Sequence, residues 1–112
     1  MKCTKLLIEC ELSQPLETAL MFNIATERVN GTELIAFNLV MPQDEKNEKK
    51  LINVAHRLLK KMKAERKIQF YATEQSFESN TTEAQFLYNK YPEIFENRET
   101  AESGCAVIYV KL

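Results

Sequence analysis

Apolar and polar residues are arranged almost symmetrically on either side of Asn30-Gly31. Asn-Gly is typical of a two-residue type I′ turn, because both central residues of that turn need positive φ. With the turn placed there, large apolar side chains meet across the two arms. The pairs are Ile24 with Phe37, Phe22 with Leu39, and Leu20 with Met41. The pattern therefore predicts a β-hairpin over residues 20–41.

A helix is the alternative structure for the first arm of this hairpin. Ser13 would cap the helix, Pro15 would stand in its first turn, and the helix would run to Val29. We prefer the hairpin, because a helix leaves the apolar pairing across Asn30-Gly31 as a coincidence.

The rest of the chain divides by its hydrophobic periodicity and its turn residues. The other predicted elements are a strand over 5–12, a helix over 45–67 capped by Asp44, a strand over 68–73, a helix over 80–91 capped by Asn80, and a strand over 105–112. Residues 74–79 are expected to form a loop. The element order β-β-β-α-β-α-β predicts one α+β domain over residues 1–112. Its single five-stranded mixed sheet begins with an antiparallel meander, and two main helices accompany it.

Every predicted strand carries apolar residues on both faces, whereas a sheet with one solvated face normally alternates apolar and polar residues. If both helices share one face, the other face exceeds the apolar patch that monomers usually expose. The pattern then predicts a homodimer or a complex with another protein. The expected interface residues are Leu7, Met21, Ala25, Leu34, Ala36 and Val40. The alternative is that the second helix covers this face.

Composition indicates one folded domain in a reducing compartment. The chain has 112 residues, of which 45% are hydrophobic and 28% are charged. Glu9 and Glu11 interrupt the apolar run near the start, so neither a signal peptide nor a membrane partner is expected. The three cysteines form no close pair, which favours a cytoplasmic location.

Charge is divided unevenly along the chain. Residues 44–67 hold nine Lys/Arg against four Asp/Glu, a net of +5, and residues 74–102 hold two against seven, a net of −5. A basic helix face of this kind can bind nucleic-acid phosphates. The candidate residues are Lys46, Lys49, Lys50, Arg57, Lys60 and Lys67. Nucleic-acid binding by an accessory protein is therefore a second functional hypothesis.

The predicted element order resembles the ribonuclease H-like fold, in which a meander of three strands precedes helix, strand, helix and strand. The resemblance implies metal-dependent phosphodiester hydrolysis by carboxylates on the first strand, the first helix and the end of the fourth strand. Glu9 or Glu11 matches the first strand and Glu74 the fourth. The sequence departs from the family because these residues are Glu where Asp is usual. The helix also lacks an inward acid, since Glu48 precedes its apolar stripe and Glu65 follows it.

No other motif points to catalysis. Cys105 and His56 are the residue types of a nucleophile–base pair, but nothing in their spacing indicates that they meet. We predict no catalytic residue, metal or cofactor. The sequence favours a small non-enzymatic protein-interaction module that acts as a homodimer or as a subunit of a complex. A degenerate ribonuclease H-like hydrolase remains the third hypothesis.

Overall fold

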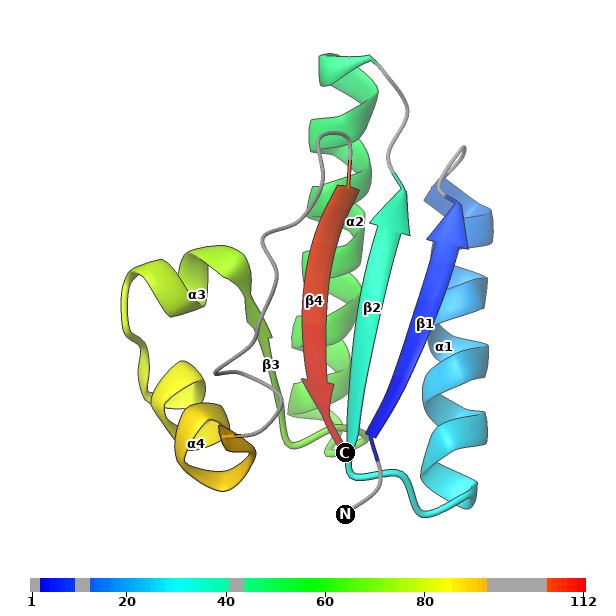
Figure 1. The fold of residues 1–112 in the computed structure, drawn as a ribbon. Helices are drawn as coiled ribbons and strands as arrows, with labels where there is room; N and C mark the ends of the chain where they lie inside the picture. The colour runs from blue at the N-terminus through cyan, green and yellow to red at the C-terminus, as the bar shows by residue number, and fades with distance from the viewer. Residues whose placement is uncertain (1–2, 10–12, 41–43, 93–104) are drawn as a thin grey trace.

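The computed structural model describes residues 3–9, 13–40, 44–92 and 105–112, and it has an α+β fold built on one mixed sheet (Figure 1). The elements in chain order are β1 (Cys3–Glu9), α1 (Ser13–Val29), β2 (Leu34–Val40), α2 (Glu45–Ala64), β3 (Phe70–Thr73), α3 (Glu74–Glu78), α4 (Thr82–Lys90) and β4 (Cys105–Lys111). The strand order in the sheet is β1-β2-β4-β3. β1 and β2 are parallel, while β4 runs antiparallel to both β2 and β3.

The predicted hairpin over residues 20–41 is wrong, because residues 13–29 form the helix α1. Asn30-Gly31 ends this helix. Gly31 has φ +79°, its N–H donates to the Arg28 carbonyl at 3.2 Å, and the Thr32 N–H donates to the Glu27 carbonyl at 3.0 Å. These two bonds are the Schellman pattern, which also favours glycine in the left-handed conformation. The positive φ that makes Asn30-Gly31 suitable for a hairpin turn therefore ends a helix in this protein.

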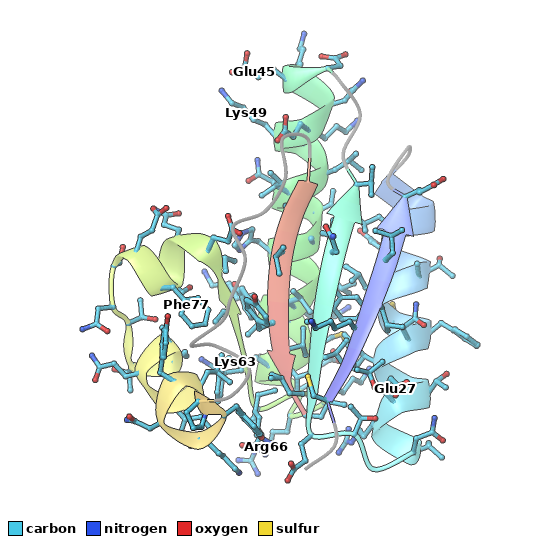
Figure 2. The ribbon with its side chains drawn as sticks, in the orientation of Figure 1. Glu27, Glu45, Lys49, Lys63, Arg66 and Phe77 are labelled. Carbon is cyan, nitrogen blue, oxygen red and sulfur yellow. The ribbon has the colours of Figure 1, made fainter. Side chains whose placement is uncertain are left out.

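A side chain near this end of α1 joins the helix to the sheet. The Glu27 carboxylate accepts a hydrogen bond from the Thr32 hydroxyl at 2.8 Å and another from the Thr4 hydroxyl of β1 at 3.4 Å. Thr32 itself is buried. Glu27 therefore connects the helix with the first strand and with the residues that lead into β2, close to the lower end of α1 in Figure 2.

The predicted topology changes as a consequence. α1 connects two parallel strands, so the antiparallel meander is absent, and the four strands of the described chain replace the five predicted ones. The predicted order β-β-β-α-β-α-β is wrong, and so is the resemblance to the ribonuclease H-like fold, because that resemblance depended on the meander. The α+β class itself is confirmed.

The main core lies between one face of the sheet and the helices α1 and α2 (Figure 1). Each helix contributes one buried stripe, and the central strands β2 and β4 supply the facing residues. The buried residues are Leu16, Leu20 and Ile24 from α1, Leu51, Ala55, Leu59 and Met62 from α2, Ile8, Ile35, Phe37, Leu39, Ile108 and Val110 from the strands, and Ile68 from the segment before β3. The predicted helix at 45–67 is confirmed in its position, and Asp44 caps it by accepting the Lys46 N–H at 3.0 Å.

A second, smaller core occupies the opposite face of the sheet, where α4 covers part of β2, β3 and β4. Its buried residues are Leu34, Ala36, Ala72 and Tyr109 from the strands, with Leu87 and Tyr91 at α4. Helices therefore lie on both faces of the sheet. This is the alternative arrangement considered above, and it removes the main reason for expecting a homodimer through the second face.

Two local predictions in this region are also corrected. The expected loop at 74–79 contains the short helix α3, which Thr73 and Ser76 cap through a reciprocal pair of hydrogen bonds. Thr81, rather than Asn80, caps α4 by accepting the Ala84 N–H at 3.3 Å. Asn80 instead ends α3 with φ +51°.

Candidate interaction surface and polar pocket

The side of α1 that faces away from the sheet is apolar. Phe22 is 68% exposed and Val29 is 87% exposed, and Ala25 is exposed between them. At about 100° per residue these three residues lie opposite the buried stripe of α1, and we call them the outer stripe of α1. Met21, which is 44% exposed, stands seven residues before Arg28 and so on the same flank of α1, from which Arg28 reaches the Lys67 carbonyl beyond α2. A helix that is apolar on opposite sides is usually covered on both.

The outer side of α2 is basic. Five of the six predicted nucleic-acid-binding residues lie there and are exposed, and Lys61 joins them. At about 100° per residue all six fall within about 60° of one line along the helix. We call them the basic stripe of α2: Lys46, Lys49, Lys50, Arg57, Lys60 and Lys61. The sixth predicted residue, Lys67, follows the helix and forms an ion pair with Glu65 at 3.8 Å.

Within the described residues, Lys49 is the one member of the basic stripe that forms an ion pair. Lys49 forms an ion pair with Glu45 at 3.5 Å near the start of α2, and both residues are labelled in Figure 2. Arg57, Lys60 and Lys61 form no ion pair with any carboxylate in the described part of the chain. The second half of α2 therefore presents three uncompensated cations.

Two of these cations, Arg57 and Lys61, lie on the part of α2 nearer to α1, whereas Lys60 lies toward His56 and the far side of the helix. Both helices follow parallel strands and pack on the same sheet face, so they run in the same direction (Figure 1). A hydrogen bond from the Arg28 guanidinium to the Lys67 carbonyl at 3.3 Å holds their C-terminal ends together. Counting back equally from that bond places Lys61 level with Phe22, and places Arg57 about one turn earlier, level with Thr18. Apolar and basic surfaces thus adjoin.

The six residues predicted as an interface do not gather on one surface. Leu34 and Ala36 are buried in the second core beneath α4. On the same face of the sheet, Leu7 is exposed and Val40 is half-buried. Met21 and Ala25 are exposed on α1. Met21 and Ala25 were assigned to the sheet only because α1 was interpreted as a strand. Only these two of the six contribute to the surface formed by α1 and α2.

A polar pocket of about 400 Å³ lies between α2, β3 and the segment that contains α3 and α4. Its lining residues are His56, Lys63, Tyr71, Thr73, Gln75, Ser76, Ser79, Thr81 and Glu83. The His56 ring meets the Tyr71 ring edge-on at 5.6 Å between centroids, with Nδ1 3.5 Å from the Tyr71 hydroxyl. Lys63 and Glu83 form an ion pair across the pocket at 4.0 Å.

Burial keeps two titratable groups of the pocket, His56 and Tyr71, in their neutral forms. Burial lowers the pKa of His56, and the neighbouring charge of Lys60 lowers this pKa further, so the imidazole is uncharged at neutral pH. Burial also raises the pKa of Tyr71. The hydroxyls of Thr73 and Ser76 already bond to each other and to the backbone as the cap of α3. The pocket is therefore lined by a neutral imidazole, by hydroxyls that already bond within the cap of α3, and by the Lys63–Glu83 ion pair.

The carboxylates implied by the ribonuclease H-like resemblance are far apart. Glu9 ends β1 at one edge of the sheet, and Glu74 follows β3 at the opposite edge. Three strand spacings separate these edges, which is about 14 Å, and Glu11 lies outside the described residues. In the described part of the chain no group of three or more His, Cys, Asp or Glu side chains could hold a metal ion.

Cysteine chemistry finds no support either. Burial raises the pKa of the Cys3 thiol, which disfavours the reactive thiolate. The side chain of Cys105, the cysteine considered as a partner for His56, lies outside the described residues. His56 faces Tyr71 and the polar pocket.

Sequence reasoning missed the outer stripe of α1 because it interpreted residues 20–29 as a strand. The signal that could have found it is the spacing of Leu16, Leu20 and Ile24, which recur every four residues and come to one side of a helix. Given that helix, Phe22 and Val29 are left on the opposite side.

No protein-family model, no curated protein and no solved structure matches this chain. The residues and the geometry of the chain itself are therefore the basis for inferring its function. Among the described residues no helix combines the length and the apolar character that crossing a bilayer requires.

Proposed function

We propose that this protein is a protein-interaction module that binds a partner on the outer surface of the layer formed by α1 and α2. The outer stripe of α1 carries the proposal. Phe22 and Val29 expose more than half of their surface, although α1 already buries a complete stripe on its other side. Apolar side chains clustered on one exposed helix face mark a surface that another molecule covers.

Site-specific crosslinking tests this proposal. A benzophenone amino acid replaces Phe22, and for comparison it replaces Asn89, which is exposed on α4. We expect a covalent adduct of defined mass from position 22 in the native host, and we expect Val29→Ser to abolish it. Equal labelling from positions 22 and 89, or none from either, would show that α1 is not an interface.

Nucleic-acid binding by the basic stripe of α2 is a second candidate. It is favoured by Arg57, Lys60 and Lys61, which lack ion-pair partners among the described carboxylates. This function leaves the outer stripe of α1 without a role, so we rank it second. It predicts that a heparin column retains the protein until moderate salt and that Arg57→Glu with Lys60→Glu abolishes retention. Flow-through at low salt excludes it.

A further inference from the structure

We infer that the partner is an acidic amphipathic helix that lies along α1 and α2; this inference rests on the interaction surface proposed above. Phe22, Ala25 and Val29 follow the spacing of one helix face and cover about 10 Å along the axis of α1. A helical segment of about three turns is long enough to cover them. Two helices that run side by side also present the ridges against which a third helix packs.

Charge specifies the second property of this partner. Arg57 and Lys61 lie on the part of the outer side of α2 nearer to α1, and no described carboxylate forms an ion pair with them. A helix seated on the outer stripe turns one flank toward these cations. Acidic residues on that flank would form ion pairs with them, while the adjacent face of the same helix supplies the apolar contacts. Complementary charge would also steer the encounter and fix the orientation.

A second copy of this chain fits the surface less well. If two copies pack with their α1 helices antiparallel, symmetry places α2 opposite α2, so that the two basic stripes face each other at a cost. If the α1 helices are parallel, only the apolar stripes meet and the cations of α2 stay unpaired. An anionic membrane is also disfavoured, because Glu17 and Glu45 are exposed near the starts of the same two helices.

Fluorescence anisotropy with a designed peptide tests the inference. The probe is a labelled peptide of roughly 15 residues with Leu on one helical face and Glu on the flanks. The comparison peptide carries Lys in place of Glu. We expect the acidic peptide to bind and the basic peptide not to bind. Two double variants should each weaken binding by about tenfold or more: Phe22→Ser with Val29→Ser, and Arg57→Glu with Lys61→Glu.

A matched control separates the surface from the overall charge of the protein. Lys5→Glu with Lys90→Glu makes the same change in net charge on β1 and α4, away from the outer surface of α1 and α2, and should leave the affinity within about twofold. Circular dichroism checks that each variant is folded, which we expect because the altered residues are exposed.

Each other outcome contradicts the inference. Binding that tolerates the Ser variants, or equal binding of the basic peptide, excludes an acidic amphipathic partner. A mass of two chains by light scattering that Phe22→Ser halves assigns the surface to a second copy. Binding to vesicles of phosphatidylserine and phosphatidylcholine, with loss in both double variants, assigns it to a membrane. A crosslinked protein at position 22 without peptide binding overturns only this inference and leaves the proposed function standing.

Discussion

Both long helices end at a residue in the left-handed conformation. This residue is Gly31 after α1, but it is Arg66 after α2, with φ +60°. Its N–H donates to the Lys63 carbonyl at 3.1 Å, and the Lys67 N–H donates to the Met62 carbonyl at 2.9 Å, so the Schellman bonds are complete. The conformation costs a non-glycine residue about 1–2 kcal/mol. Because both hydrogen bonds of this helix end are formed, the left-handed φ of Arg66 is the only unfavourable feature of the motif.

Replacement of Arg66 by glycine should relieve this strain. Part of the gain is offset by the greater entropy of glycine in the unfolded chain. We therefore expect Arg66→Gly to raise the free energy of unfolding by about 0.5–1 kcal/mol, measured by urea denaturation. Arg66→Ala removes the same side chain without relieving φ and serves as the control. A glycine variant no more stable than the alanine variant would contradict the argument.

Tyr91 is only 1% exposed, and its buried hydroxyl has no hydrogen-bond partner among the described residues. An unsatisfied buried hydroxyl costs about 1–3 kcal/mol. Tyr91→Phe removes the hydroxyl and keeps the ring in the second core, so it should raise the free energy of unfolding by about 1 kcal/mol. Tyr71→Phe, whose hydroxyl lies 3.5 Å from His56 Nδ1, should give no gain. A destabilised Tyr91→Phe protein would show that the hydroxyl has a partner in solution.

His56 should make stability depend on pH. Burial and Lys60 lower its pKa in the folded state below the ordinary value of 6.5. Above pH 6.5 both states are neutral at this residue. As the pH falls from 6.5 toward the lowered folded-state pKa, the unfolded state binds the proton first, so stability falls. Urea midpoints at about pH 7.5 and 5 should therefore differ more for the wild type than for His56→Gln. Equal pH dependence in the two proteins would rule out this linkage.

At the scale of the element, α1 makes a prediction that distinguishes a helix from the hairpin. In a hairpin Leu20 and Phe22 share one face, but in α1 Leu20 is buried and Phe22 is 68% exposed. Leu20→Ala should therefore lower the free energy of unfolding by about 2–5 kcal/mol. Phe22→Ala should change it by less than about 0.5 kcal/mol. Similar losses from both substitutions in urea denaturation would return both residues to one buried face.

The two long helices differ in how well their sequence patterns predicted them. α2 could be predicted because its apolar stripe, its cap at Asp44 and its basic outer side all agree. The helix now seen as α1 was rejected in favour of a hairpin because large apolar residues pair across Asn30-Gly31, a dipeptide that suits both a hairpin turn and a helix end. Local chemistry could not decide between these uses. The decision belongs to the tertiary structure, in which Leu16, Leu20 and Ile24 pack on the sheet beside α2.

The interpretation of residues 20–29 as a strand also affected the prediction of the candidate site. The basic stripe of α2 could be predicted, since it requires only the helix and its period of 3.6 residues. The outer stripe of α1 could not be predicted from a strand, because period-two alternation assigns Phe22 to the core. The two stripes are neighbours because β1 and β2 are adjacent parallel strands, and such a pair needs a long crossover connection, which α1 supplies.

At the scale of the whole molecule, the two cores should differ in stability. The main core joins α1, α2 and the central strands, whereas the second core depends on Leu87 and Tyr91 to hold α4 against the sheet. A region with fewer buried apolar contacts opens at a lower free energy than the rest of the fold. Amide hydrogen exchange should therefore show weaker protection in α4 than in the buried turns of α2.

Leu87→Ala tests this difference directly. The substitution should speed exchange in α4 by about tenfold or more, since it removes the fully buried leucine that α4 contributes to the second core. Amide protection in α1 should fall only by the amount that the substitution lowers the global free energy of unfolding. Leu59→Ala is the matched control, because Leu59 is equally buried in the main core and its loss should accelerate exchange in all elements together. Equal acceleration of α1 and α4 in the Leu87→Ala protein would mean that the two cores unfold as a single cooperative unit.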